Sequence, residues 1–221
     1  MRSRFLFLAV LVCVMAGSAA SGPTEAERIL ERCRVAHASI PGLRAGFVMT
    51  SGSDTTRGEI HMRRPRMFRH QTPRSTVVTD GQSLWVYSDE LDQVIITPAE
   101  GPGGDPPPMI KPPEGGTPSL AGVDTLEGIP CHVIDLRPLY ARGPEDKIRL
   151  WIQFGTNLMA RLEYHDPFSG RTTYTLTDMA IVADFPDSMF VYEPPPGAEV
   201  IDLREGGAGL EALLERLESD E

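Results

Sequence analysis

The sequence contains little of what catalysis, metal binding or nucleic-acid binding requires. Its five histidines are scattered, and no HExxH or Cys/His zinc spacing occurs. It also lacks a G-x-S-x-G elbow and a phosphate-binding loop. Acidic residues outnumber basic ones by 31 to 21, giving a net charge of −10, whereas nucleic-acid binding needs a basic face. We therefore expect no enzyme, no nucleic-acid partner, no metal and no other cofactor.

Long apolar segments are missing after the N-terminus. There, two arginines precede an apolar stretch that is too short to span a bilayer, and small residues follow it. This pattern predicts a signal peptide over residues 1–20, cleaved near Ala20, and hence an exported protein. A lipoprotein signal is the alternative because of Cys13, but the preceding Val12 is bulky where that processing requires a small residue.

Cysteine is scarce, with three residues, one of which lies in the expected signal peptide. The other two, Cys33 and Cys131, remain after cleavage. Two cysteines in an oxidising compartment often form a disulfide. The alternative is that both are buried thiols that pack as small hydrophobic side chains. The sequence leaves a Cys33–Cys131 disulfide as one of two possibilities.

Short runs of alternating apolar and polar residues dominate the chain. Successive side chains of a strand point to opposite faces, so this alternation predicts half-buried strands. Asp80-Gly81 separates two such runs and is a strong hairpin signal. We predict about ten or eleven strands, among them residues 43–49, 59–63, 67–71, 75–79, 84–87, 93–97, 123–126, 129–136, 148–154, 158–165 and 171–182. A short turn and a strand are expected within residues 185–192, and Val200-Ile201 is a candidate edge strand.

One helix is expected at each end of the domain. Thr24 and Glu27 form a capping-box signature, and apolar residues recur at helical spacing over residues 25–39. This helix either packs simply against the sheet or forms part of a cover over a concave sheet face. The acidic segment 205–221 carries a leucine stripe and predicts an amphipathic helix that needs packing to be stable. It either docks on the domain or frays in solvent.

Residues 98–118 are rich in proline and glycine, so neither a helix nor a strand can persist there. A loop of this length inside a domain is uncommon and is either functional or loosely ordered. One interpretation is a mobile surface loop. The other is a flap over a ligand cavity, with Met109 and Ile110 as its apolar tip.

The strands imply one mainly β domain over residues 21–204. A twisted antiparallel sheet of this size curls into a barrel or half-barrel. Two helices cannot cover all of its apolar surface, so an incompletely filled interior would form a ligand cavity. The candidate lining residues are Phe47, Met49, Ile60, Met62, Val77, Leu84, Val86, Val94, Ile96, Leu150, Ile152, Leu162 and Leu176. The alternative is that these side chains fill their own core.

Several short motifs occur in the order and spacing of a known family. They are Arg64-Pro65, Met67-Phe68-Arg69, Thr79-Asp80-Gly81, Leu84-Trp85-x-Tyr87, Gln93-Val94, Leu162-Glu163-Tyr164-x-Asp166-Pro167-Phe168-x-Gly170 and Pro195-Pro196-Gly197-Ala198-Glu199-Val200-Ile201. On these motifs the chain resembles the periplasmic outer-membrane lipoprotein carrier family (LolA/LolB-like), over about residues 43–98 and 147–202.

The resemblance implies an unclosed β-barrel with helices as a lid over an apolar cavity. It also implies a monomeric periplasmic chaperone that takes acylated lipoproteins from an inner-membrane ABC transporter and passes them to an outer-membrane receptor. A binding or sensor protein with the same fold, for another apolar ligand or a protein partner, is the alternative function.

One residue role follows from the resemblance. Arg64 matches a family arginine that binds backbone carbonyls of the lid and keeps the empty cavity closed. A guanidinium suits this role because it has several fixed donors and a permanent charge. The alternative for Arg64 is an exposed strand arginine.

Overall fold

The computed structural model describes residues 22–100, 110–139, 141, 143, 146–166 and 170–204. The expected signal peptide, Met109 and the expected C-terminal helix lie outside these residues. The described part contains one α-helix, one 3-10 helix and a single twelve-stranded sheet. No helix in it combines the length and hydropathy needed to cross a membrane.

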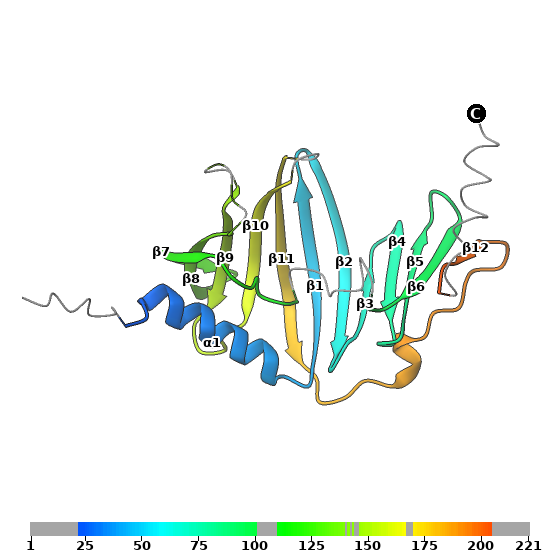
Figure 1. The fold of residues 1–221 in the computed structure, drawn as a ribbon, viewed down its shortest axis with the longest axis horizontal. Coiled ribbons are helices and arrows are strands. Elements are labelled where there is room, and N and C mark those ends of the chain that lie inside the picture. The colour runs from blue at the N-terminus through cyan, green and yellow to red at the C-terminus, as the bar shows by residue number, and fades with distance from the viewer. Residues whose placement is uncertain are drawn as a thin grey trace, which may run out of the picture.

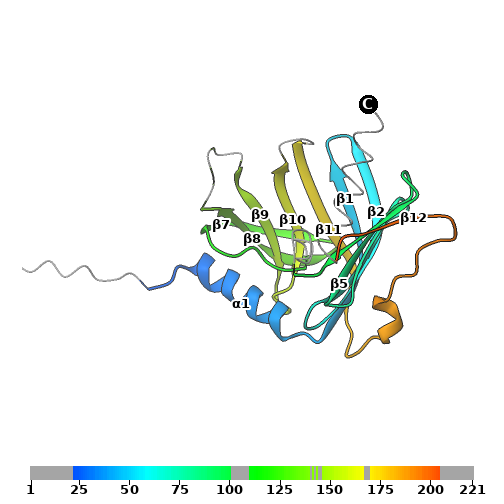
Figure 2. The ribbon, with the colours of Figure 1, turned by 45° about the vertical axis from the view of Figure 1, so that its right-hand side comes forward.

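The strands form one continuous sheet that curls without closing (Figures 1 and 2). They are β1 (Gly42–Ser51), β2 (Asp54–Arg63), β3 (Met67–Gln71), β4 (Ser75–Thr79), β5 (Ser83–Ser88), β6 (Gln93–Pro98), β7 (Thr117–Leu126), β8 (Ile129–Arg137), β9 (Ile148–Gln153), β10 (Met159–Asp166), β11 (Gly170–Ile181) and β12 (Glu199–Asp202). Their order is β12-β6-β5-β4-β3-β2-β1-β11-β10-β9-β8-β7, so β12 and β7 lie at the two ends. Neighbours are antiparallel, except that β12 runs parallel to β6. The predicted unclosed antiparallel barrel is confirmed.

The second half of the chain departs from the sequence prediction in three places. The prediction of a strand within residues 185–192 is wrong, because this segment contains the 3-10 helix η2 (Asp187–Phe190). Flanking prolines explain this, since they lack the amide donors that strand pairing requires. The candidate edge strand at Val200-Ile201 is present as β12. The predicted loop over residues 98–118 is slightly too long, because β7 already begins at Thr117.

Helix α1 (Glu25–Ser39) has the bounds that its sequence signals predict. The Thr24 amide donates to the Glu27 carboxylate at 2.6 Å, and the Glu27 amide donates to the Thr24 hydroxyl at 3.2 Å, which completes the capping box. The buried side of α1 packs against strands β8 to β10. This cluster contains Ala26, Ile29, Leu30 and Cys33 of the helix together with Ile134, Leu136, Leu150, Ile152, Met159 and Leu162. The helix therefore covers one part of the curled sheet and leaves the rest to other elements.

The segment after β11, which contains η2, packs near β3 on the side of the sheet away from α1 (Figure 2, orange). Arg63, the last residue of β2, holds it there. Its guanidinium donates to the Phe185 carbonyl at 2.6 Å and to the Asp187 carboxylate at 2.5 Å, and it lies 5.1 Å from the ring centroid of Phe190. We call residues 184–193 the strap, and it supports the outer face of the sheet.

Candidate functional site

Strand pairing determines which side chains lie on the face covered by α1. Cross-strand partners point to the same side of a sheet. Leu150, which packs against α1, pairs with Leu162, and further pairs continue across the sheet to Phe47 opposite Leu176. The same pairing places nearly all of the predicted lining residues on this one face, which we call the inner face. They are Phe47, Met49, Ile60, Met62, Val77, Leu84, Val86, Leu150, Ile152, Leu162 and Leu176.

The prediction that Val94 and Ile96 share this face is wrong. Ile95 pairs with Val86, so Ile95 is the side chain of β6 that points to the inner face. Its two neighbours point to the outer face, because adjacent side chains in a strand alternate. Both are buried there. The sequence pattern could not decide which side chains of this strand point to the inner face, because three apolar residues follow one another without alternation.

Two apolar clusters divide the inner face. One lies beneath α1 and contains Leu150, Ile152 and Leu162. The other lies over the middle strands, and Met49, Val77 and Val86 pack at its margin, only partly buried. Its buried members are Ile40, Leu43, Ala45, Phe47, Ile60, Met62, Phe68, Leu84, Ile110, Leu158 and Leu176.

Ile110 enters this second cluster from outside the sheet. It belongs to residues 110–114, which follow the undescribed part of the Pro/Gly-rich loop, and which we call the cover segment. Its side chain is 4% exposed and packs among the residues of the middle strands. The apolar end of the cover segment thus occupies space on the inner face that a ligand chain could take.

His37 joins three parts of the molecule. The Met159 amide of β10 donates to its Nε2 atom at 3.0 Å, so Nε2 carries no proton. Nδ1 must then carry the proton and donates it to the Ile110 carbonyl, also at 3.0 Å. Burial lowers the pKa of His37 to about 4, and the nearby Arg64 charge acts in the same direction. A neutral His37 therefore connects α1, the cover segment and the sheet.

Two arginines complete these connections. Arg64 donates through Nε to the Ile40 carbonyl at 3.1 Å and through Nη2 to the His37 carbonyl. These acceptors lie at the C-terminal end of α1, where helix carbonyls lack intrahelical partners. Arg34 of α1 donates to the Pro113 carbonyl at 2.8 and 3.3 Å. Polar contacts thus tie α1 to the end of β2 and the cover segment to α1.

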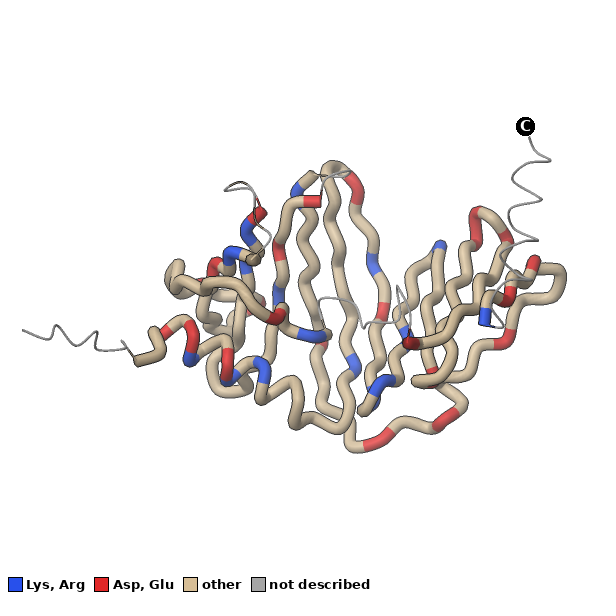
Figure 3. Tube along the Cα trace, viewed as in Figure 1, with Lys and Arg blue, Asp and Glu red and all other residues tan. Residues whose placement is uncertain are grey.

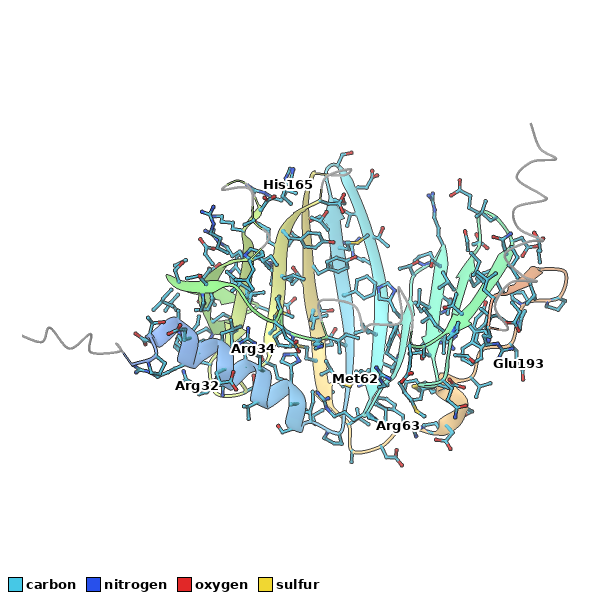
Figure 4. The ribbon with its side chains drawn as sticks, viewed as in Figure 1. Arg32, Arg34, Met62, Arg63, His165 and Glu193 are labelled. Carbon is cyan, nitrogen blue, oxygen red and sulfur yellow. The ribbon has the colours of Figure 1, made fainter. Side chains whose placement is uncertain are left out.

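A cavity of about 390 Å³ opens where these parts meet. α1 contributes Arg34 and His37, the β2–β3 region contributes Arg64 and Phe68, and the cover segment contributes Ile110. Figure 4 labels two of the lining side chains, Arg34 and Met62. The volume lies within the range of small-molecule sites. A second cavity, of about 510 Å³, lies between the first turns of α1 and residues 115–118.

The disulfide considered for Cys33 and Cys131 is not formed, and both thiols are free and buried. Cys33 lies on the buried side of α1 and packs against the inner face. Cys131 packs with Val133 and Trp151 in a cluster on the outer face, so the β8 strand separates the two sulfurs. Burial raises the pKa of Cys33 to about 12 and also raises that of Cys131. They behave as small hydrophobic residues.

Sequence reasoning missed His37. The available signal was its position, because it continues the buried stripe of α1 that Ile29 and Cys33 begin at intervals of four residues. A histidine on an apolar helix face must find partners, since burying an unpaired polar group is costly. Which partners it finds depends on the cover segment and β10, distant in sequence. Within the described residues, no three His, Cys, Asp or Glu side chains gather as a metal site would require.

Comparison with known proteins shows what this covered half-barrel is similar to. The family model described as "Outer membrane lipoprotein carrier protein LolA" matches residues 44–109. A model described as "Predicted periplasmic protein (DUF2092)" matches residues 113–204. The outer-membrane lipoprotein carrier protein of Legionella pneumophila is 26% identical over 148 residues, covering 65% of this chain and 72% of the relative. That of Chromohalobacter salexigens is 27% identical over 157 residues, covering 68% and 71%.

A solved structure supports the fold independently. The crystal structure of an uncharacterized conserved protein from Thermus thermophilus superposes with a TM-score of 0.59 at 13% identity, covering 81% of this chain and 99% of that chain. The fold and inner face define an open antiparallel half-barrel with a covered apolar surface. The resemblance seen in the sequence motifs is confirmed: part of the chain matches the LolA model, and the chain is similar to outer-membrane lipoprotein carrier proteins.

Proposed function

We propose that this protein is a periplasmic chaperone that shelters the acyl chains of lipoproteins on its inner face and carries them from the inner to the outer membrane. The relatives named as lipoprotein carriers support the cargo and the route. An ABC transporter as donor and a membrane receptor as acceptor belong to the same proposal. It involves binding and release, and no covalent bond is made or broken.

The observation that carries the proposal is the insertion of Ile110 into the apolar cluster of the middle strands. When the cover segment lifts, the cluster loses this side chain and gains space for an acyl chain. Each methylene group sheltered from water contributes roughly 0.8 kcal/mol. Burying a whole acyl chain would thus contribute more free energy than burying the side chain of Ile110. The open cover is therefore favoured only when cargo is present.

Arg64 is the proposed closing residue, because its two hydrogen bonds hold the end of α1 beside the cavity. Replacing Arg64 with Leu removes both bonds and leaves the carbonyls of His37 and Ile40 without these donors. We expect the variant to open more easily and to retain cargo. The reason is that the empty, closed state loses stability relative to the open state with bound cargo. Arg57→Leu, at an exposed position of β2, is the matched control.

The test is native mass spectrometry of wild type, Arg64→Leu and Arg57→Leu, each purified from the periplasm of the native host, followed by transfer to outer-membrane vesicles. We expect an added mass that matches an acylated lipoprotein, enriched in Arg64→Leu and unchanged in Arg57→Leu. Mass addition by a different apolar ligand, with no delivery to vesicles, would instead indicate a LolA-fold binding or sensor protein. Equal release rates in the two variants would contradict the closing role of Arg64.

A further inference from the structure

Basic side chains gather around the 390 Å³ cavity, although the chain as a whole is acidic. Arg34 comes from α1, Arg64 and Arg66 from the β2–β3 connection, and Lys111 from the cover segment. The one acidic lining residue among those described is Glu114. Figure 3 shows basic positions where these elements approach one another. Four positive charges thus face a space whose wall is otherwise largely apolar.

The present partners of these charges are neutral carbonyls or exposed carboxylates. Arg34 donates to the Pro113 carbonyl and lies 3.7 Å from the exposed Glu31 carboxylate. Arg64 donates only to neutral carbonyls, and no carboxylate of the described residues forms an ion pair with it. Arg66 pairs with Glu100 at 2.9 Å and Lys111 with Glu114 at 3.0 Å. Both pairs are solvent-exposed, with Arg66 at 57% and Lys111 at 54% exposure. Exposed pairs of this kind contribute little and exchange readily.

The apolar wall lies directly beside the charges. Met62 at 7%, Phe68 at 2% and Ile110 at 4% exposure belong to the cavity lining and also to the apolar cluster of the middle strands. A molecule in this cavity would therefore meet basic groups at its polar end and the inner face at its other end. That arrangement matches an amphiphile with one anionic head group and an acyl tail.

We propose that the cavity bounded by Arg34, Arg64, Arg66 and Lys111 binds the anionic head group of a lipid, a carboxylate or a phosphate, while the acyl tail enters the inner face. The inference rests on the proposed function, because it needs the same apolar cavity, and it specifies the ligand class at its entrance. A permanent positive charge and several donors suit both head groups. Desolvation of the apolar tail supplies affinity, and the basic groups supply the preference for a negative head.

The experiment compares ligands that share a tail and differ in head charge. The full chain is loaded with the neutral apolar dye N-phenyl-1-naphthylamine, and displacement is measured with palmitate against hexadecanol. A second pair, dihexanoyl phosphatidylglycerol against dihexanoyl phosphatidylcholine, separates the phosphate source from the carboxylate source. The test variant is the double change Arg66→Gln and Lys111→Gln, whose exposed positions make misfolding a minor concern. Its control is Arg57→Gln with Arg74→Gln, an equal loss of charge at exposed positions outside the cavity lining.

We expect at least one anionic ligand to displace the dye more strongly than the ligand that has the same tail but no net charge. This preference for the anionic ligand should fall roughly tenfold in the test variant and stay unchanged in the control. The preferred pair identifies the head group. Equal displacement within both pairs would overturn the inference and leave the proposed function intact, because the tails still bind. A wild-type protein that binds neither dye nor any ligand would refute the apolar cavity, and the inference and the proposed function would fail together.

Discussion

The stability of this domain should depend on pH through His37. Its neutral state is fixed by two hydrogen bonds, one accepted by Nε2 and one donated by Nδ1. Protonating Nε2 would break the first bond and place a charge beside Arg64 in a buried position. Since the folded pKa of about 4 is below the ordinary value of 6.5, the unfolded chain binds the proton more tightly. The stabilisation by neutral His37 is therefore complete above pH 6.5 and is lost as the pH falls toward 4.

The magnitude follows from the difference in pKa. One pKa unit corresponds to 1.36 kcal/mol, so the full difference amounts to about 3 kcal/mol below pH 4, and about 2 kcal/mol is lost between pH 6.5 and pH 5. Against a typical domain stability of about 5–15 kcal/mol, this loss is easily measured. His70 is also buried, with its pKa lowered to about 4, so wild type alone does not isolate His37.

The measurement is urea unfolding of wild type and His37→Gln at pH 7.5 and pH 5.0. Glutamine cannot titrate and cannot make both hydrogen bonds at the imidazole positions, so we expect the variant to be less stable by about 1–3 kcal/mol at pH 7.5. At pH 5.0 the two proteins should differ by about 2 kcal/mol less, because wild type alone loses the His37 contribution. His70 contributes equally to both proteins and cancels. Parallel pH dependences in the two proteins would refute the assignment of a neutral, doubly bonded His37.

Two further predictions concern the inner face. Gly58→Ala should destabilise the fold by about 1–3 kcal/mol in urea unfolding, because the new Cβ would clash with the Gln71 carbonyl oxygen and with the Phe47 ring. Gly22→Ala, whose Cβ meets nothing within 4 Å, should be neutral. Ile110→Ala should increase N-phenyl-1-naphthylamine binding, since it removes apolar side-chain volume from the inner face; unchanged dye binding would show that the isoleucine does not occupy the ligand space.

Local signals predicted the elements whose structure is decided by neighbouring residues. The capping box predicted the start of α1. The Asp80-Gly81 turn is also present, and the Asp80 carboxylate accepts hydrogen bonds from the amides of Gln82 and Ser83 at 2.8 Å. The alternating runs gave most strands within a residue or two of their observed bounds. In each of these cases, one short stretch contains both the signal and the partner that satisfies it.

Features that depend on distant partners could not be predicted in the same way. The face on which Val94 lies follows from the pairing of β6 with β5. The bonds of His37 join residues separated by 73 and 122 positions in sequence. For Arg64 the motif resemblance suggested backbone carbonyls as partners, but only the fold identifies them as the carbonyls of His37 and Ile40. The site therefore required the structure, even where the fold did not.

The end of β2 explains how a cover could open without loss of the sheet. Arg63 binds the strap on the outer face through the Phe185 carbonyl and the Asp187 carboxylate, and the next residue, Arg64, binds the end of α1. Arg63 thus holds the strap on the outer face, and Arg64 holds the end of α1 on the inner face. If α1 and the cover segment move, the contacts of Arg63 and the strap remain, so the middle strands keep their outer packing while the inner face becomes accessible. Opening then costs the hydrogen bonds that join α1 to Arg64 and to the Met159 amide. It also costs the burial of Ile110 and of the apolar side of α1, and sheltering an acyl chain can offset this cost.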